Sequence, residues 1–317
     1  GFDELVPARW VGGARDLRTI RWQALDPVRQ LVHETPSGSG VVIAGRAQFF
    51  SSADELVTAL GMEGCAVFGL DDFDEDQVRT FTADPSLTLP EWLPSRPLLL
   101  KFVLENGLIG SAEEPDTSPA QAWHQILRAI SAREAQRVSS LTPDYVLALI
   151  ARVATLTRVS GNSAGFVTMD DMRSAFRDVC NYEPEEQGVQ QLLRLPGLTS
   201  AGGDGPDGER RRFVDEDLAD AAYGIDLAGY VAAPYAQHPL GGPATWTGAA
   251  GRFTPGVAAA DLEYQQYPAG IVQAPIRQRT DHGYLDAVLM DVALVADALQ
   301  YTNPPDSPLF FSGVQIS

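Results

Sequence analysis

The chain has 317 residues, enough for about two domains with apolar cores, and 44% of its residues are hydrophobic. Its formal net charge of -19 argues against wholesale nucleic-acid binding, and no apolar run approaches the roughly 18 residues that a membrane span needs. The two cysteines, Cys65 and Cys180, form no CxxC motif and no Cys/His cluster, so we expect free thiols in a cytoplasmic protein.

The amino-terminal part alternates strand and helix patterns. Residues 13–34 have the apolar spacing of a helix that Pro27 is expected to kink or divide. The runs Val41–Ala44 and Cys65–Leu70 are short and continuously apolar, which is typical of buried strands in a parallel sheet. We therefore predict an α/β unit over residues 1–88.

Helices dominate from residue 89 onward. Pro97 is expected to begin a helix that ends near Glu105, and Ser118-Pro119 and Thr142-Pro143 each place a capping hydroxyl before a proline at the first helical position. We predict a helical segment over residues 89–141.

The next stretch has the order of a winged-helix domain. Helices are predicted after Thr142, after the capping pair Thr168 and Asp171, and over Glu185–Leu195. Two short strands around a glycine-rich tip then form a hairpin over residues 198–214. Three helices followed by a hairpin predict a winged helix over residues 142–224.

The carboxyl-terminal part is less regular. We expect a linker over residues 225–256, which is rich in glycine, proline and alanine. Residues 257–317 stay unassigned, as the start of a further domain. They hold short β-like runs such as Gly270–Val272, but 287–299 has equally the spacing of a helix, with one face made of Val288, Val292, Val295 and Leu299.

Two common catalytic motifs are excluded. The sequence contains no G-x-x-x-x-G-K-[ST] loop, and its one lysine, Lys101, lies inside an apolar helix pattern. Gly161–Gly165 matches the G-x-S-x-G nucleophile elbow, but it follows a helix rather than a strand, so Ser163 is not expected to be a nucleophile.

Four segments resemble, in order, motifs of the NACHT-family STAND NTPases. Gly1-Phe2-Asp3-Glu4-Leu5 looks like the end of the extended Walker B signature, and Gly45-Arg46 is similar to the sensor 1 arginine at a strand end. Phe73–Val78 resembles the segment after the next strand, and Pro97–Leu100 resembles the proline-leucine element beside the adenine. The resemblance covers residues 1–235 and implies the distal part of a P-loop NTPase core whose phosphate-binding half is missing.

The resemblance also implies roles for individual residues. Asp3 and Glu4 would position and deprotonate the attacking water, with Asp3 near the Mg²⁺ ion. Arg46 would bind the γ-phosphate of ATP, and Pro97 would pack on the adenine. The family often has a phosphate-binding histidine after Phe-Val in the winged helix, whereas this chain has Asp215 after Phe213-Val214.

The implied function is that of a signalling switch. ATP and ADP with Mg²⁺ would control self-association of the intact protein after a trigger protein acts, as in proteins of bacterial defence, while the fragment itself would not bind nucleotide tightly. The alternative is a non-enzymatic winged-helix module for protein contacts or transcriptional control. Arg194 is the one basic residue of Glu185–Leu195, beside Glu185 and Glu186, so DNA binding is not favoured.

We expect the chain of residues 1–317 not to hydrolyse ATP, because a P-loop that would hold the β- and γ-phosphates is missing from it. Phosphate release from ATP and Mg²⁺ in the presence of the purified chain measures this. A turnover that the Glu4→Gln substitution abolishes would contradict the expectation.

Overall fold

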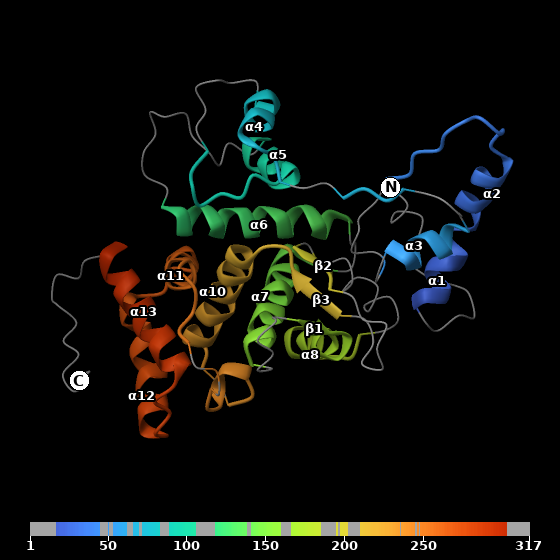
Figure 1. The fold of residues 1–317 in the computed structure, drawn as a ribbon. Helices are drawn as coiled ribbons and strands as arrows, with labels where there is room; N and C mark the ends of the chain where they lie inside the picture. Colours follow the sequence, from blue (N-terminus) through green and yellow to red (C-terminus); the bar gives the residue numbers. More distant parts are fainter. Residues whose placement is uncertain are drawn as a thin grey trace.

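The computed structural model of the chain describes residues 17–44, 50, 53–61, 66–69, 72–82, 89–105, 118–137, 141–159, 166–184, 195, 197–201, 210–234, 236–244, 246 and 248–302. This part of the chain is mainly helical and contains a small three-stranded antiparallel sheet (Figure 1).

The helices of the amino-terminal third are α1 (Leu17–Ala24), α2 (Asp26–Glu34), α3 (Ala53–Leu60), α4 (Glu75–Thr82) and α5 (Pro97–Glu105). The remaining helices are α6 (Pro119–Arg137), α7 (Pro143–Val159), α8 (Met169–Cys180), α10 (Glu216–Ala232), α11 (Thr254–Tyr264), α12 (Gln273–Asp281) and α13 (Ala287–Thr302), with 3-10 turns η3 (Pro239–Gly241) and η4 (Ala269–Val272). The strands are β1 (Val167–Thr168), β2 (Leu198–Ser200) and β3 (Arg210–Phe213).

Side-chain caps account for where several helices begin. The Ser118 hydroxyl accepts the Gln121 N–H at 3.2 Å before α6, and the Thr168 hydroxyl accepts the Asp171 N–H at 3.1 Å before α8. These bonds satisfy amide groups that have no partner within the first helical turn. The predicted starts of α5, α6, α7 and α8 are confirmed, and α1 and α2 are divided at Leu25, just before Pro27.

The sheet joins the predicted hairpin to a strand that precedes α8. β2 and β3 pair antiparallel, with Leu198 opposite Phe213, and β1 pairs with the other edge of β3, with Val167 opposite Arg211. The strand order is therefore β1-β3-β2. The hairpin over residues 198–214 is confirmed, whereas residues 185–194 of the predicted third helix lie outside the described residues.

Helix α10 is the centre of the helical part. Ten of its residues from Ala221 to Val231 are buried, because α7 packs on one side of it and α11 on another. Helix α6 crosses over α7, α10 and α11, and α13 packs on the outer side of α11 (Figure 1). A helix that is apolar nearly all round is typical of such a central position.

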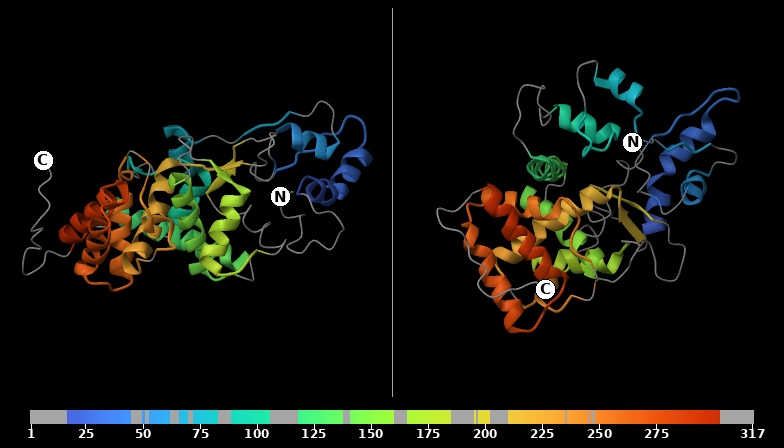
Figure 2. Two further views of the ribbon diagram at one scale, coloured as in Figure 1. Left: turned by 90° about the horizontal axis from the view of Figure 1, so that it is seen from below. Right: turned by 60° about the vertical axis from the view of Figure 1, so that its left-hand side comes forward.

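The first three helices pack mainly on one another. A small apolar cluster, formed by Ala24, Leu25, Phe50, Ala59 and Leu60, lies between them. They lie at one end of the molecule, and α11–α13 lie at the other, as the views in Figure 2 show.

The predicted buried strands of the amino-terminal unit are not found. Residues 41–44 and 66–69 form neither strand nor helix, and the side chains of Val42 and Phe68 are 96% and 88% exposed. A continuous apolar run becomes a buried strand only when other strands pair with it on both edges. Within the described residues, the expectation of an α/β sheet over 1–88 is therefore wrong.

The carboxyl-terminal region is a structured continuation of the helical core. Helix α10 runs through residue 224, where we expected the winged-helix unit to end, and Leu240 within the expected linker is fully buried. Residues 287–299 are helical, with Val288, Val292, Val295 and Leu299 buried as one face. The β-like run Gly270–Val272 belongs instead to η4. One continuous apolar core includes these residues together with those of α6 and α7.

Because α11 shares this core, Leu262→Ala should destabilise the whole helical part, by about 2–5 kcal/mol. Leu262 is fully buried, whereas Leu285 is 82% exposed, so Leu285→Ala is the matched control and should change the free energy of unfolding by less than about 0.5 kcal/mol. Urea unfolding followed by circular dichroism and by tryptophan fluorescence measures both. Two separate transitions, with only the smaller shifted by Leu262→Ala, would contradict the shared core.

Candidate functional site

The predicted nucleotide-site residues are only partly located. Asp3, Glu4 and Arg46 lie outside the described residues, so their positions relative to one another stay predictions. Pro97 is the first residue of α5, as predicted. The candidate site is therefore considered around the first residues of α5.

Arg96 connects three segments at this place. Its guanidinium Nε lies 3.4 Å from Asp72 Oδ1, and its Nη2 lies 3.9 Å from Asp215 Oδ2. Asp215 also caps α10, since its Oδ1 accepts the Leu218 N–H at 3.1 Å. The Asp215 carboxylate thus faces a cation next to Pro97.

A cavity of about 150 Å³ lies between α5, α6 and the beginning of α10. Its walls are mostly apolar, with charged groups among them, and consist of Arg96, Leu99, Phe102, Trp123, Leu127, Ile130, Arg133, Glu134, Ile150, Gly197, Val214, Asp215 and Leu218. One buried donor of the residues that line this cavity, the Trp123 indole N–H, has no hydrogen-bond partner, whereas Arg96 Nε makes no hydrogen bond but is ion-paired with Asp72. An unpaired buried donor costs about 1–3 kcal/mol, which an acceptor on a ligand would recover. We name this space the α5 cavity.

A second cavity, of about 540 Å³, lies between α6, α7, α8, α10 and α11. Its size is within the usual range for small-molecule sites. It is lined by Arg128, Asp144, Leu147, Ala148, Ala151, Arg152, Asp178, Val179, Ile225, Asp226, Gly229, His238, Asp261, Tyr264 and Gln265. We name it the α7 cavity, because five of these residues form one stripe along α7.

Asp226 is the most connected side chain of the α7 cavity. Arg152 Nε donates to both of its oxygens, at 3.2 and 3.0 Å, and the Thr155 hydroxyl donates to Oδ2 at 2.5 Å. Arg152 Nη1 also donates to Asp178 at 3.1 Å. The buried ion pair therefore ties α10 to α7, and through Asp178 to α8.

His238 completes this group from the loop after α10. Its Nδ1 accepts the Leu240 N–H at 3.1 Å, so the proton of the ring lies on Nε2, which faces Asp226 Oδ1 at 3.5 Å. Burial by itself would raise the pKa of Asp226, but the hydrogen bond from His238 and the Arg152 guanidinium outweigh burial and lower this pKa from 3.8 to about 2. Asp226 is therefore an ionised anchor at neutral pH.

The opposite end of the α7 cavity joins α6 to α11. Arg128 lies over the Tyr264 ring, 4.0 Å from its centroid, and reaches Asp144 of α7 at 3.5 Å. Beside it, His124 Nε2 lies 3.0 Å from Asp261 Oδ1. Ionisable groups thus occupy both ends of the cavity, with apolar side chains between them.

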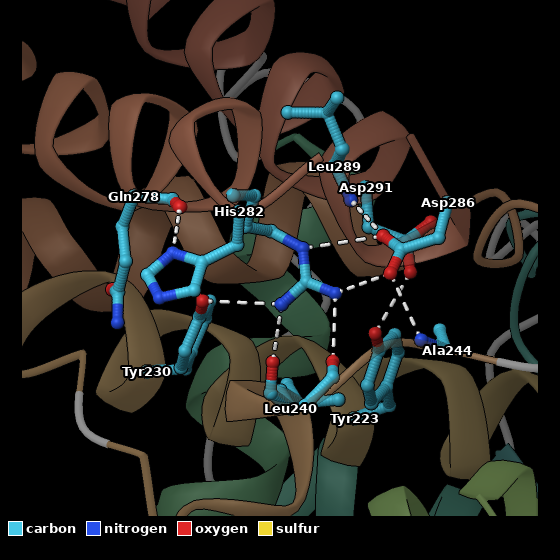
Figure 3. Close-up of polar contacts among 11 residues, drawn as sticks. Tyr223, Tyr230, Leu240, Ala244, Gln278, His282, Asp286, Leu289 and Asp291 are labelled. Carbon is cyan, nitrogen blue, oxygen red and sulfur yellow. Dashed lines mark hydrogen bonds and ion pairs between the residues drawn. The ribbon is translucent and has the colours of Figure 1, made fainter. Parts of the chain in front are cut away.

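A further polar network holds the loops that follow α10 against α12 and α13 (Figure 3). Arg279 is buried and donates to the carbonyls of Leu240 and Gly242 and to the Tyr230 hydroxyl, while Asp286 receives the Arg279 guanidinium and the Ala244 N–H. Asp291 accepts the Tyr223 hydroxyl at 2.7 Å and the Ala250 N–H at 2.6 Å. The donors and acceptors pair within the protein, so this network is structural.

The sequence pattern did not single out the α7 cavity. The Asp226–Arg152 pair is separated by 74 residues along the chain, and spacing rules detect only neighbours on one element. The one local signal was the presence of Asp226 within an otherwise apolar helix pattern. Such a carboxylate indicates a buried partner without identifying it.

Comparisons with known protein families, curated proteins and solved structures find no match to this chain. Among the described residues, no group of three or more His, Cys, Asp or Glu side chains is arranged to hold a metal ion. None of the described helices is long and apolar enough to cross a membrane.

Asp226→Asn should destabilise the protein by roughly 3 kcal/mol at pH 7, because it leaves Arg152 without its buried counter-charge. Since the folded-state pKa of Asp226 is lowered, its contribution is present above pH 3.8 and is lost as the pH falls toward about 2. Over that pH window the free energy of unfolding of the native protein should fall by about 2 kcal/mol more than that of the variant.

Urea unfolding of both proteins between pH 7 and pH 2 measures these differences, with Asp76→Asn on the exposed surface of α4 as control. If the free energies of unfolding of the native protein and Asp226→Asn change with pH by equal amounts, Asp226 is not an ionised anchor.

Proposed function

We propose that this chain is the downstream part of a NACHT-like nucleotide-dependent signalling switch, in which the α5 cavity receives the adenine base. The observation that carries the proposal is the position of Arg96, the residue before Pro97, beside Asp215 at one cavity. In the family that the chain resembles, the same two elements, the proline-leucine helix and the end of the winged helix, both approach the nucleotide.

The topology of residues 143–213 supports this proposal. A helix, a strand, a helix and a hairpin follow one another, and the first strand joins the hairpin through its last strand. This order is typical of winged-helix domains, which in the family follow the nucleotide-binding core.

The size and chemistry of the α5 cavity support a base rather than a whole nucleotide. A volume of about 150 Å³ is below the usual range for complete ligands, so ribose and phosphates would extend outside it. Adenine offers ring nitrogens as acceptors, and the Trp123 indole N–H is a buried donor without a hydrogen-bond partner. The apolar walls suit the faces of the ring.

Arg96 also accounts for an acid at the position of the family's histidine. A carboxylate alone would repel phosphate, but the Arg96 guanidinium lies between the two carboxylates of Asp72 and Asp215. In the proposed switch, phosphate would compete with Asp215 for Arg96 and loosen the contact between α5 and α10. The P-loop would come from residues outside this chain, and self-association would follow nucleotide exchange.

The alternative, a winged helix that binds DNA, is less well supported. Strand β3 contains three consecutive arginines, Arg210–Arg212. The middle one, Arg211, is fully buried, so the three do not present a continuous basic surface. A non-enzymatic protein-contact module remains the competing reading and predicts no adenosine binding.

Saturation-transfer NMR on residues 1–317 should detect adenosine in preference to guanosine. Trp123→Phe removes the indole donor and should weaken adenosine binding about tenfold, the effect of one hydrogen bond in a desolvated site. Trp92→Phe is the matched control, because Trp92 packs edge-on against Trp123 without lining the cavity. Absence of an adenosine signal, or an equal loss in both variants, would overturn the proposal.

A further inference from the structure

The α7 cavity contains charges that are placed along a line. Asp144, Leu147, Ala148, Ala151 and Arg152 of α7 all face it, at positions i, i+3, i+4, i+7 and i+8 of one helix stripe. Eight residues of α-helix correspond to about 12 Å. The cavity is therefore elongated along α7.

Carboxylates lie at both ends of this line. Asp144 and Asp261 are at the end where α6 and α11 meet α7, and Asp178 and Asp226 are at the end near α8 and α10. The basic side chains of the lining are Arg128, Arg152 and His238, so the four carboxylates outnumber them. The excess of negative charge favours a cationic ligand over an anionic one.

The outer carboxylates retain acceptor capacity. The Asp144 side chain is 82% exposed and meets Arg128 at 3.5 Å, and the Asp178 side chain is 33% exposed and accepts from Arg152. A carboxylate has about four lone-pair positions, so each can accept further N–H groups. The segment between the ends is lined by aliphatic side chains, including Leu147 and Ile225.

A glycine leaves part of the cavity wall open. Gly229 is the exposed residue in a stretch of α10 that is otherwise buried, and a Cβ added there would meet no atom within 4 Å. Gly224 in the same helix differs, because a Cβ there would lie 2.7 Å from the Thr254 carbonyl of α11. Glycine within a helix costs about 1 kcal/mol relative to alanine, and at Gly229 no packing contact requires that cost.

From this geometry we infer that the α7 cavity is a binding site for a linear aliphatic triamine such as spermidine. Its terminal nitrogens are about 11 Å apart in the extended form, from ordinary single-bond lengths, which is close to the roughly 12 Å of α7 between Asp144 and Arg152, the residue that binds Asp178. The terminal ammonium groups pair with Asp144 and Asp178, and the methylene groups lie along Leu147, Ala148 and Ile225. The central ammonium remains hydrated at the open wall beside Gly229.

Calorimetric titration of residues 1–317 with spermidine should give saturable binding of one ligand per chain. Putrescine, whose nitrogens are too close together to reach both ends, should bind at least about tenfold more weakly. Succinate, a small dicarboxylate, should not bind.

Two variants separate this site from general attraction to an acidic protein. Gly229→Leu fills the cavity from a position with free space, so it should abolish saturable spermidine binding without lowering the melting temperature. The pair Asp144→Asn and Asp178→Asn should weaken binding about tenfold or more. Asp170→Asn, on the exposed side of α8, is the control and should leave binding unchanged.

Undiminished binding to folded Gly229→Leu, equal affinity for putrescine, or binding of succinate instead would each overturn the inference, as would absence of saturable binding. If Gly229→Leu does not fold, the double asparagine variant decides by the same criterion. Because none of these residues lines the α5 cavity, the outcome is independent of adenosine binding.

Discussion

The ionised carboxylate of Asp226 is the constraint on which the helical part of this protein depends. Burying a charge is costly unless donors surround it, and here Arg152, Thr155 and His238 supply them from two further segments. The helices can therefore pack in one relative arrangement, in which these donors converge. Apolar contacts alone between α7 and α10 would tolerate small shifts, whereas a satisfied buried ion pair does not.

Arginine rather than lysine is suited to this architecture. The chain has a single lysine, and two of its buried cations, Arg152 and Arg279, each bind several oxygens from different segments. A guanidinium offers five N–H donors in a fixed plane, so one side chain can fix a helix and two loop carbonyls at once. The preference for arginine over lysine therefore has a structural consequence both in the loops around α12 and at Asp226.

Local chemistry predicted helix starts well and tertiary pairing poorly. Ser118, Thr168 and Pro97 act within one turn, so the sequence alone locates α5, α6 and α8. Residues 41–44 and 66–69 were predicted as strands but form none, because pairing partners are not encoded in a short apolar run. Helices α10 and α11 were missed or cut short because burial on all sides removes the amphipathic contrast. Near the candidate sites, only the position of Pro97 at the start of a helix could be predicted, because the contacts around the two cavities join residues distant in sequence.

The near-complete enclosure of α10 has a consequence for how the chain is made. During synthesis α10 leaves the ribosome before α11, which packs on one side of it, has been added. At several residues per second, that apolar side of α10 stays uncovered for seconds while about thirty further residues are made. We therefore expect nascent chains of this length to bind chaperones, and premature termination within α11 to leave a product that aggregates or is degraded.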